Sequence, residues 1–237
     1  MSMKKLKLSV FYYLYLAFIL IGSELVYSQD KQVNYYTNHT IEDFLSDNEA
    51  QSAIDHLEWN RELLESIIFR YTNKARISKG LEQFRYEATL YKAARIHADE
   101  MILKDFYSHI NPFSKKWKSP KDRIHYFNPN FYTLAENISQ NNLLYHQGEA
   151  LKYSVSFNTK KQEYIFLNQT NTAIRNFTYI ELAQKIAQQW MDSKAHRKNI
   201  LNKDFNNLAC SCKLQEKSFK SDEPPIIRCV QNFGSLK

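Results

Sequence analysis

The sequence predicts an α+β fold in which helices and strands pack as layers, and two observations support this. Three segments carry apolar residues at the spacing of one helix face, at about residues 59–80, 88–104 and 178–190. Strand-like patterns occupy about residues 143–169, 207–214 and 225–233. Because the segments do not follow a strict βαβ alternation, a layered α+β domain is favoured over a parallel-sheet fold.

The first helix begins near Trp59, and Gly80 provides its C-terminal cap. Five residues fall on one face at positions i, i+3, i+4, i+7 and i+11: Leu64, Ile67, Ile68, Tyr71 and Ala75. In the second helix, His97 lies on the inner face with Leu90 and Met101, which is typical of a core histidine. A proline-marked loop and a short helix at 121–126 follow.

The later elements have equally local signals. Thr178 and Glu181 form a capping box that opens the third long helix. Within 143–169, Tyr153, Val155 and Phe157 alternate with polar residues, as in a half-buried strand. Residues 29 to about 57 are polar and lack periodicity, so we expect a spacer or a loosely docked N-terminal extension, 29–60, with order beginning near Trp59.

The first 28 residues have the pattern of a secretory signal peptide. Lysines at positions 4, 5 and 7 precede an apolar run from about Leu8 to Gly22. Ser28 then supplies the small residue expected just before a cleavage site. The alternative is an uncleaved membrane anchor, although Glu24 limits the apolar run. Both interpretations place the rest of the chain outside the cytoplasm, in the periplasm, at the cell surface or secreted. Cleavage would leave no stable membrane span.

Composition excludes several classes of function. The chain of 237 residues has only four glycines and no GxGxxG or GxxxxGK[ST] motif, which excludes Rossmann and P-loop nucleotide sites. Removing residues 1–28 reduces the net charge from +7 to +5, since that segment carries three lysines and one glutamate. The remaining charges of both signs are interspersed, so we expect no nucleic-acid partner.

Three cysteines lie near the C-terminal end, Cys210, Cys212 and Cys229. Cys210 and Cys212 share one face of a predicted strand, and Cys229 lies in the next strand. An exported protein meets oxidising conditions, so we expect one of the pair to form a disulfide with Cys229 and the other to stay free. The spacing does not match a zinc ribbon, and it leaves the partner open.

Standard hydrolase signals are missing, since the chain has neither HExxH nor GxSxG. The residues that remain for chemistry are His109 after the second helix, Glu136 in an Ala-Glu-Asn run, and His196 after the third helix. Spacing alone does not require that they meet, and each is also compatible with an ordinary surface or capping role.

Taken in order, several segments resemble the CAP superfamily, which includes the cysteine-rich secretory proteins, antigen 5 and the pathogenesis-related proteins. Within it, the chain resembles the bacterial SCP-like branch. The resemblance covers about residues 61–237. Its most specific part is the run Trp190-Met191-x-Ser193-x-x-His196-Arg197-x-Asn199-Ile200-Leu201. The supporting segments are Asn73-x-x-Arg76-x-x-x-Gly80-Leu81, Ala93-Ala94-x-x-His97-Ala98, Ser108-His109, Arg123-Ile124 and Ala135-Glu136-Asn137-Ile138.

The resemblance implies a three-layer α-β-α sandwich with a central cleft. Carried onto this sequence, His109 and His196 are the cleft imidazoles, which bind a divalent cation such as zinc in several members, and Glu136 is the first acid. The position of the second acid holds Ser193. Asp192 is adjacent, but one helical step turns it about 100° away, so it is no obvious substitute. Ser193 therefore argues against tight metal binding.

The stretch at about 141–178 is an insertion relative to compact members, where we expect either specific recognition or a surface hairpin without a partner. The favoured function is an exported binding module with an extracellular lipid or protein ligand, and an enzymatic role is disfavoured but left open. One alternative is a zinc-dependent hydrolase using His109, His196 and Glu136, with Glu136 as the base. Another is a structural cell-envelope protein.

Overall fold

The computed structural model describes residues 35–147, 151–215 and 222–236. The chain divides into a first unit, residues 1–38, and a second unit, residues 39–237, to which all elements below belong. The predicted signal peptide at residues 1–28 lies outside the described residues. Within the described ranges, no helix has the length and apolar character needed to cross a membrane.

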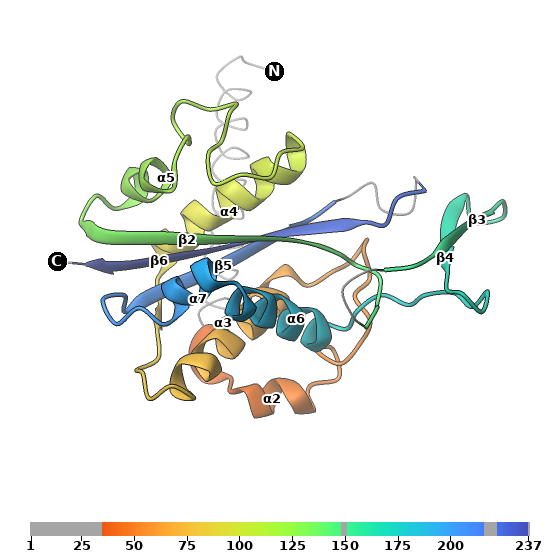
Figure 1. Cartoon of the computed structure of the whole chain (residues 1–237), viewed down its shortest axis with the longest axis horizontal. Helices are drawn as coiled ribbons and strands as arrows, with labels where there is room; N and C mark the ends of the chain where they lie inside the picture. Colours follow the sequence, from red (N-terminus) through yellow and green to blue (C-terminus); the bar gives the residue numbers. More distant parts are fainter. Residues whose placement is uncertain (1–34, 148–150, 216–221, 237) are drawn as a thin grey trace, which may run out of the picture. The chain divides into compact units, whose positions relative to one another are not determined.

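A four-stranded sheet forms the centre of the second unit (Figure 1). In spatial order its strands are β1 (Arg85–Tyr86), β5 (Asn207–Leu214), β6 (Ile226–Leu236) and β2 (Phe131–Asn142). The β1–β5 pair is parallel, whereas β5–β6 and β6–β2 are antiparallel. The long strand β6 is therefore central, and β2 forms one edge of the sheet.

Helices cover both faces of this sheet, as Figure 1 shows. One face carries α4 (Ala88–Leu103), which packs on β5 and β6, and α5 (Pro120–Phe127), which packs on α4 and β2. The other face carries α3 (Arg61–Ile77), α6 (Tyr179–Asp192) and α7 (Lys194–Ile200). The α+β prediction and the α-β-α sandwich implied by the resemblance are both confirmed.

Local sequence signals place the helix ends. The Thr178 side chain accepts a hydrogen bond from the Glu181 N–H, and Glu181 reciprocates, so α6 begins with the predicted capping box. After α3, Gly80 takes a positive φ of 68°, which glycine adopts without steric cost and which reverses the chain. Helix α5 begins with a second capping box, made by Ser119 and Asp122, and with Pro120 in its first turn.

The prediction for the N-terminal extension is wrong in part, because order begins well before Trp59. Helix α2 (Ile41–Ser46) opens with a capping box and packs on α3. Ile41, Phe44 and Ile54 are buried, and the Ile54 N–H donates to the Phe177 carbonyl. Burial of such side chains contributes roughly 1.5–3 kcal/mol each, enough to fix a polar segment that has only a few apolar anchors.

A disulfide joins Cys212 to Cys229, and Cys210 is a buried thiol that is not part of a disulfide. Cys212 and Cys229 lie directly opposite each other in the β5–β6 register, whereas Cys210 lies opposite Gln231. The expectation of one bridge and one cysteine outside it is confirmed, and the register decides the partner that the sequence leaves open. Burial raises the pKa of the Cys210 thiol, so this thiol is protonated and unreactive.

The segment after β2 carries a separate hairpin, β3 (Ser154–Asn158) and β4 (Glu163–Leu167), as the strand-like pattern predicts. One face of the hairpin is apolar. Tyr153 contacts the ring of Phe166, and Phe157 contacts Tyr164. Phe166 is buried, while Tyr153, Val155 and Phe157 keep 38–45% of their surface exposed.

Candidate functional site

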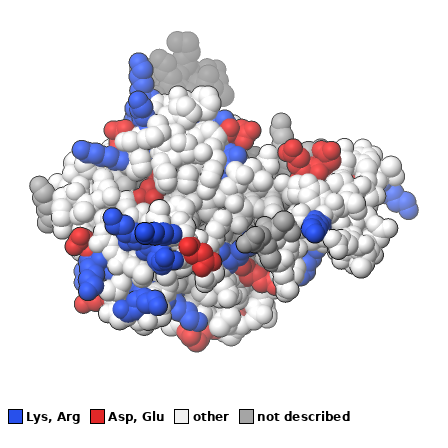
Figure 2. All heavy atoms as spheres, in the orientation of Figure 1, with Lys and Arg blue, Asp and Glu red and all other residues white. Residues whose placement is uncertain are grey.

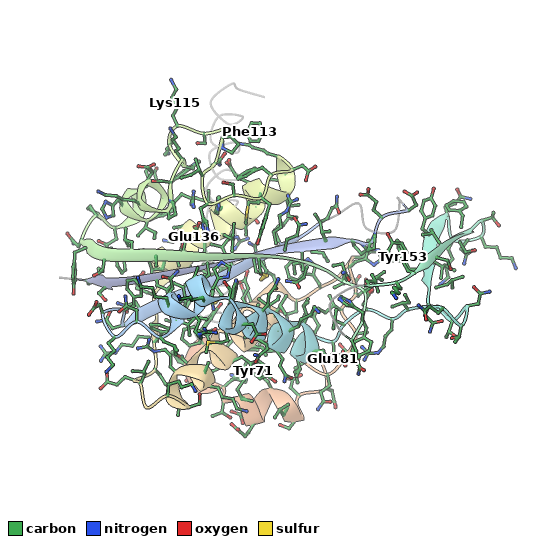
Figure 3. All side chains as sticks on the ribbon, in the orientation of Figure 1. Tyr71, Phe113, Lys115, Glu136, Tyr153 and Glu181 are labelled. Atoms are coloured by element: carbon green, nitrogen blue, oxygen red, sulfur yellow. A yellow bond between two sulfur atoms is a disulfide. The ribbon has the colours of Figure 1, made fainter. Side chains whose placement is uncertain are left out.

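Glu136 lies on the edge strand β2 and points toward the layer of α4 and α5 (Figure 3). Its side chain is only 1% exposed. Successive strand residues point to opposite faces of a sheet, so the next residue, Asn137, points toward the layer of α6 and α7. The Glu-Asn pair in the sequence therefore reaches both helical layers from one strand.

Both carboxylate oxygens of Glu136 have partners. The ring of His109 donates from Nδ1 to Oε1 at 2.9 Å, and the Arg123 guanidinium donates from Nη2 to Oε2 at 2.7 Å. Burial by itself would raise the pKa of Glu136, but the hydrogen bond from His109 and the charge of Arg123 outweigh it and lower the pKa. Glu136 is therefore an anion held between two donors.

Arg123 is the residue that holds Glu136 and the loop before α5 together. Its side chain is fully buried, and it donates to the carbonyl oxygens of Trp117, Lys118 and His109 at 3.0, 3.2 and 3.1 Å. One guanidinium thus ties α5, the loop before it and Glu136 together. The Arg123-Ile124 segment of the resemblance is the one signal for this residue in the sequence, and it implies no role, because a sequence does not show that an arginine in a short helix is buried.

His97 lies on the α4 side of the same carboxylate and is fully buried, as expected for a core histidine. Its Nε2 lies 2.9 Å from the Ser108 carbonyl oxygen and 3.8 Å from Glu136 Oε1. Burial lowers the pKa of His97 to about 4, despite the nearby charge of Glu136. The ring is therefore neutral at physiological pH and fixes the segment that carries His109.

On the other face of β2, Asn137 is buried and anchors α7. Its Nδ2 donates to the His196 carbonyl at 3.3 Å and to Gln231 Oε1 at 3.3 Å, while Asn199 Nδ2 donates to Asn137 Oδ1 at 2.8 Å. The amide group supplies both donors and an acceptor, which aspartate could not do. Asn137 therefore sets the position of the helix that carries His196.

His196 is half-buried on α7, and its Nδ1 has no hydrogen-bond partner in the described part of the chain. Burial, and then the positive charge of His109, lower the pKa of His196. Glu136 accepts a hydrogen bond from His109, and the next strand residue, Asn137, donates to the main chain of His196, so the two imidazoles belong to segments anchored on opposite faces of the same part of β2. Figure 2 shows the basic side chains of α7 gathered on this surface, with acidic side chains beside them.

Two other candidates take different positions. Ser193 lies between the end of α6 and the start of α7, and its side chain makes no capping hydrogen bond to α7. Asp192 accepts a hydrogen bond from Gln188 Nε2 at 2.8 Å, away from the imidazoles.

These residues fit a divalent cation only in part. The bond from His109 Nδ1–H to Glu136 leaves Nε2 with a lone pair for a ligand, which is how a carboxylate orients a metal-binding histidine. His196 supplies a second imidazole. Among residues 35–147, 151–215 and 222–236, however, no three His, Cys, Asp or Glu side chains meet in a way that could hold a metal. A structural zinc site has four protein ligands and a catalytic one has three.

A model of the cysteine-rich secretory protein family, CAP, matches residues 69–233. The chain is 24% identical over 144 residues to the uncharacterized protein YkwD of Bacillus subtilis, and 25% identical over 144 residues to the uncharacterized membrane protein YlbC of the same organism. Each match covers 61% of this chain, but only 40% of YkwD and 30% of YlbC.

Two solved structures are similar in fold. One is an extracellular protein of Bacillus anthracis that contains an SCP domain, with 19% identity and a TM-score of 0.48 over 75% of this chain and 42% of that one. The other is an outer surface protein of Borrelia burgdorferi, with 16% identity and a TM-score of 0.46 over 72% of this chain and 91% of that one. The family match covers more than half of the chain and includes His109, Glu136 and His196, so the protein belongs to the CAP family of cysteine-rich secretory proteins.

Proposed function

We propose that the protein is an exported binding module whose cleft of His109, Glu136 and His196 holds a ligand without converting it. The state of Glu136 carries this proposal. Its side chain is only 1% exposed, each of its oxygens accepts a hydrogen bond, from His109 and Arg123, and its pKa is lowered. A general base needs an oxygen within reach of the reacting proton and a pKa near the working pH, so burial and the lowered pKa both disfavour Glu136 in that role.

Export is supported by two features that are independent of the cleft. The N-terminal pattern is that of a signal peptide, and Cys212 is bonded to Cys229. Disulfides persist in oxidising compartments and are rare in the cytosol, where thiols are kept reduced. We therefore place the ligand, a lipid or a protein, outside the cytoplasm.

We further propose that the two imidazoles take up a divalent cation such as zinc weakly. His109 Nε2 and His196 are the protein ligands, and water or the bound partner completes the coordination. The absence of a third protein ligand in the described ranges, and Ser193 where relatives place an acid, both favour weak over tight binding. The cation would serve as a bridge to the ligand.

Zinc titration followed by calorimetry tests the cleft. The wild type should bind zinc reversibly, and the His109→Ala/His196→Ala double variant should bind it at least about tenfold more weakly, because both donors are lost. The matched control is His56→Ala, which removes an imidazole outside the cleft. Equal zinc affinity in wild type and double variant would contradict the cation proposal.

The same proteins separate the alternatives. Under saturating zinc we expect no hydrolysis of peptide, lipid-ester or nucleic-acid substrates. Turnover that disappears in Glu136→Gln would establish the hydrolase. Lipid extraction with mass spectrometry, and cross-linking to envelope proteins, should detect a ligand that the double variant loses. If the double variant only melts lower and keeps every interaction, the cleft is structural.

A further inference from the structure

A second site lies along β2, beyond the cleft, where the strand edge faces the outer side of α6. A cavity of about 710 Å³ occupies this space, within the usual size range of ligand pockets. Figure 2 shows that the surface along the middle of β2 is largely uncharged. The described residues that line it are Gln140, Asn141, Asn142, His146, Lys185, Gln188, Gln189, Asp192 and Ile226.

Side-chain amides dominate this lining, and they satisfy one another only in part. Asn141 Nδ2 donates to Gln189 Oε1 at 3.0 Å, and Gln188 Nε2 donates to Asp192 Oδ1 at 2.8 Å. Each amide has two N–H donors and an oxygen with two lone pairs. Every one of these side chains therefore retains donors or acceptors for a ligand that offers both, as a peptide group does.

The main chain of β2 is also open at this point. Leu143 N–H donates to the Pro225 carbonyl, so odd-numbered residues here face β6, and residues 138, 140 and 142 direct their main-chain groups outward. Trp190 Nε1 and the Tyr107 hydroxyl donate to the Ile138 carbonyl at 3.1 and 3.2 Å. These side chains occupy the strand edge at Ile138, so another strand cannot pair with β2 at that residue.

Beyond that closure, in the described part of the chain, the carbonyl of Gln140 and both main-chain groups of Asn142 have no hydrogen-bond partner. An open edge of this kind pairs with another extended strand. It lies on the far side of Tyr107 and Trp190 from His109 and His196.

The two ends of the groove differ in charge. His146 Nδ1 lies 2.9 Å from the Leu144 carbonyl oxygen, and its Nε2 lies 3.3 Å from Lys185 Nζ. The basic side chain of Lys185 stands at one end of the groove, and the acidic side chain of Asp192 stands at the other. Seven residues of helix separate them, about 10 Å, the span of roughly three extended residues.

We infer that this groove binds an extended peptide segment, which adds to the open end of β2 through main-chain hydrogen bonds while the amides of Gln188 and Gln189 contact its other side. An acidic side chain of the peptide faces Lys185. Recognition by strand addition draws affinity from main-chain groups. A sugar is disfavoured, because no Phe, Tyr or Trp ring is among the described lining residues to stack on it.

Selection of random heptapeptides displayed on phage against the purified full chain tests this inference. Selected peptides should carry an acidic residue, and N-methylation of their central main-chain amides should weaken binding at least tenfold. Gln188→Ala/Gln189→Ala should also weaken it at least tenfold. The matched control is Gln184→Ala, an exposed amide on the same helix outside the groove, which should bind as the wild type does.

A main-chain variant keeps the test decisive. Asn142→Pro removes the outward N–H of an edge strand, a position where proline is tolerated, and should abolish binding while circular dichroism stays unchanged. The inference is overturned if no peptide is enriched, if N-methylated peptides bind equally well, or if a glycan array gives binding that Gln188→Ala/Gln189→Ala removes. Because His109→Ala/His196→Ala leaves this groove intact, peptide binding should survive in it.

Discussion

Replacing Arg123 with methionine should lower the free energy of unfolding by about 3–5 kcal/mol, the usual cost of removing one partner of a buried ion pair. The guanidinium is fully buried and holds Glu136 Oε2 at 2.7 Å. Methionine fills a similar volume but leaves a buried carboxylate without its cation, and it releases three carbonyl oxygens of the loop. Urea unfolding followed by circular dichroism measures the loss.

Two variants decide whether the lost charge is the cause. Lys121→Met changes an exposed cation on the same helix and should alter the stability by less than about 0.5 kcal/mol. Adding Glu136→Gln to Arg123→Met removes the unpaired charge and should recover part of the stability. If Arg123→Met and Lys121→Met are equally stable, the ion pair does not hold the cleft together.

Acid should destabilise the protein in a window set by His97. Its folded-state pKa is about 4, below the ordinary 6.5, so the unfolded chain binds an extra proton between these values. Stability is therefore full above pH 6.5 and falls as the pH drops toward 4, by about 3 kcal/mol in total. The groups that act on the ring are Glu136, Arg123 and His109.

Glu136 acts at lower pH. Its pKa is below the ordinary 4.5, so its contribution is present above pH 4.5 and is lost as the pH falls through the lowered value. The interval from 6.5 to 4.5 therefore reports His97 and not Glu136, together with a contribution from His196, whose pKa is also lowered by burial. His97→Gln retains a neutral donor for the Ser108 carbonyl and should reduce the acid-dependent loss in that interval to the part that His196 contributes.

The matched control for the pH profile is His125→Gln. The Nε2 of His125 lies 2.9 Å from the Phe131 carbonyl, a similar bond on a half-buried ring. This variant should keep the acid-dependent loss. Unfolding free energies measured every half pH unit would contradict the assignment if His97→Gln and wild type gave parallel curves.

Helices and the C-terminal strands could be predicted because their signals are local. The apolar spacing of α3 and α4, the Thr178 capping box and Gly80 depend on residues a few positions apart. Strands β5 and β6 are apolar enough to be recognised without knowing their neighbours. The family resemblance added the order of the motifs and, with it, the sandwich.

The strand β2 was not predicted, although it carries the centre of the site. Its run Ala-Glu-Asn-Ile-Ser-Gln-Asn-Asn is polar on both faces, so it lacks the alternation that identifies a half-buried strand. Glu136 and Asn137 are buried because side chains from two helical layers satisfy them, and those partners are 27 and 62 residues away in sequence. Such partners are visible only after folding.

The central place of β6 has a consequence for biogenesis. Residues 226–236 join β5 to β2, so the sheet has no continuous core until translation has passed them. A nascent chain that ends earlier would lack the strand on which both α4 and β2 pack, and contacts so distant in sequence form slowly. On the proposed export, the polypeptide would therefore still be unfolded when it is threaded through a secretion channel.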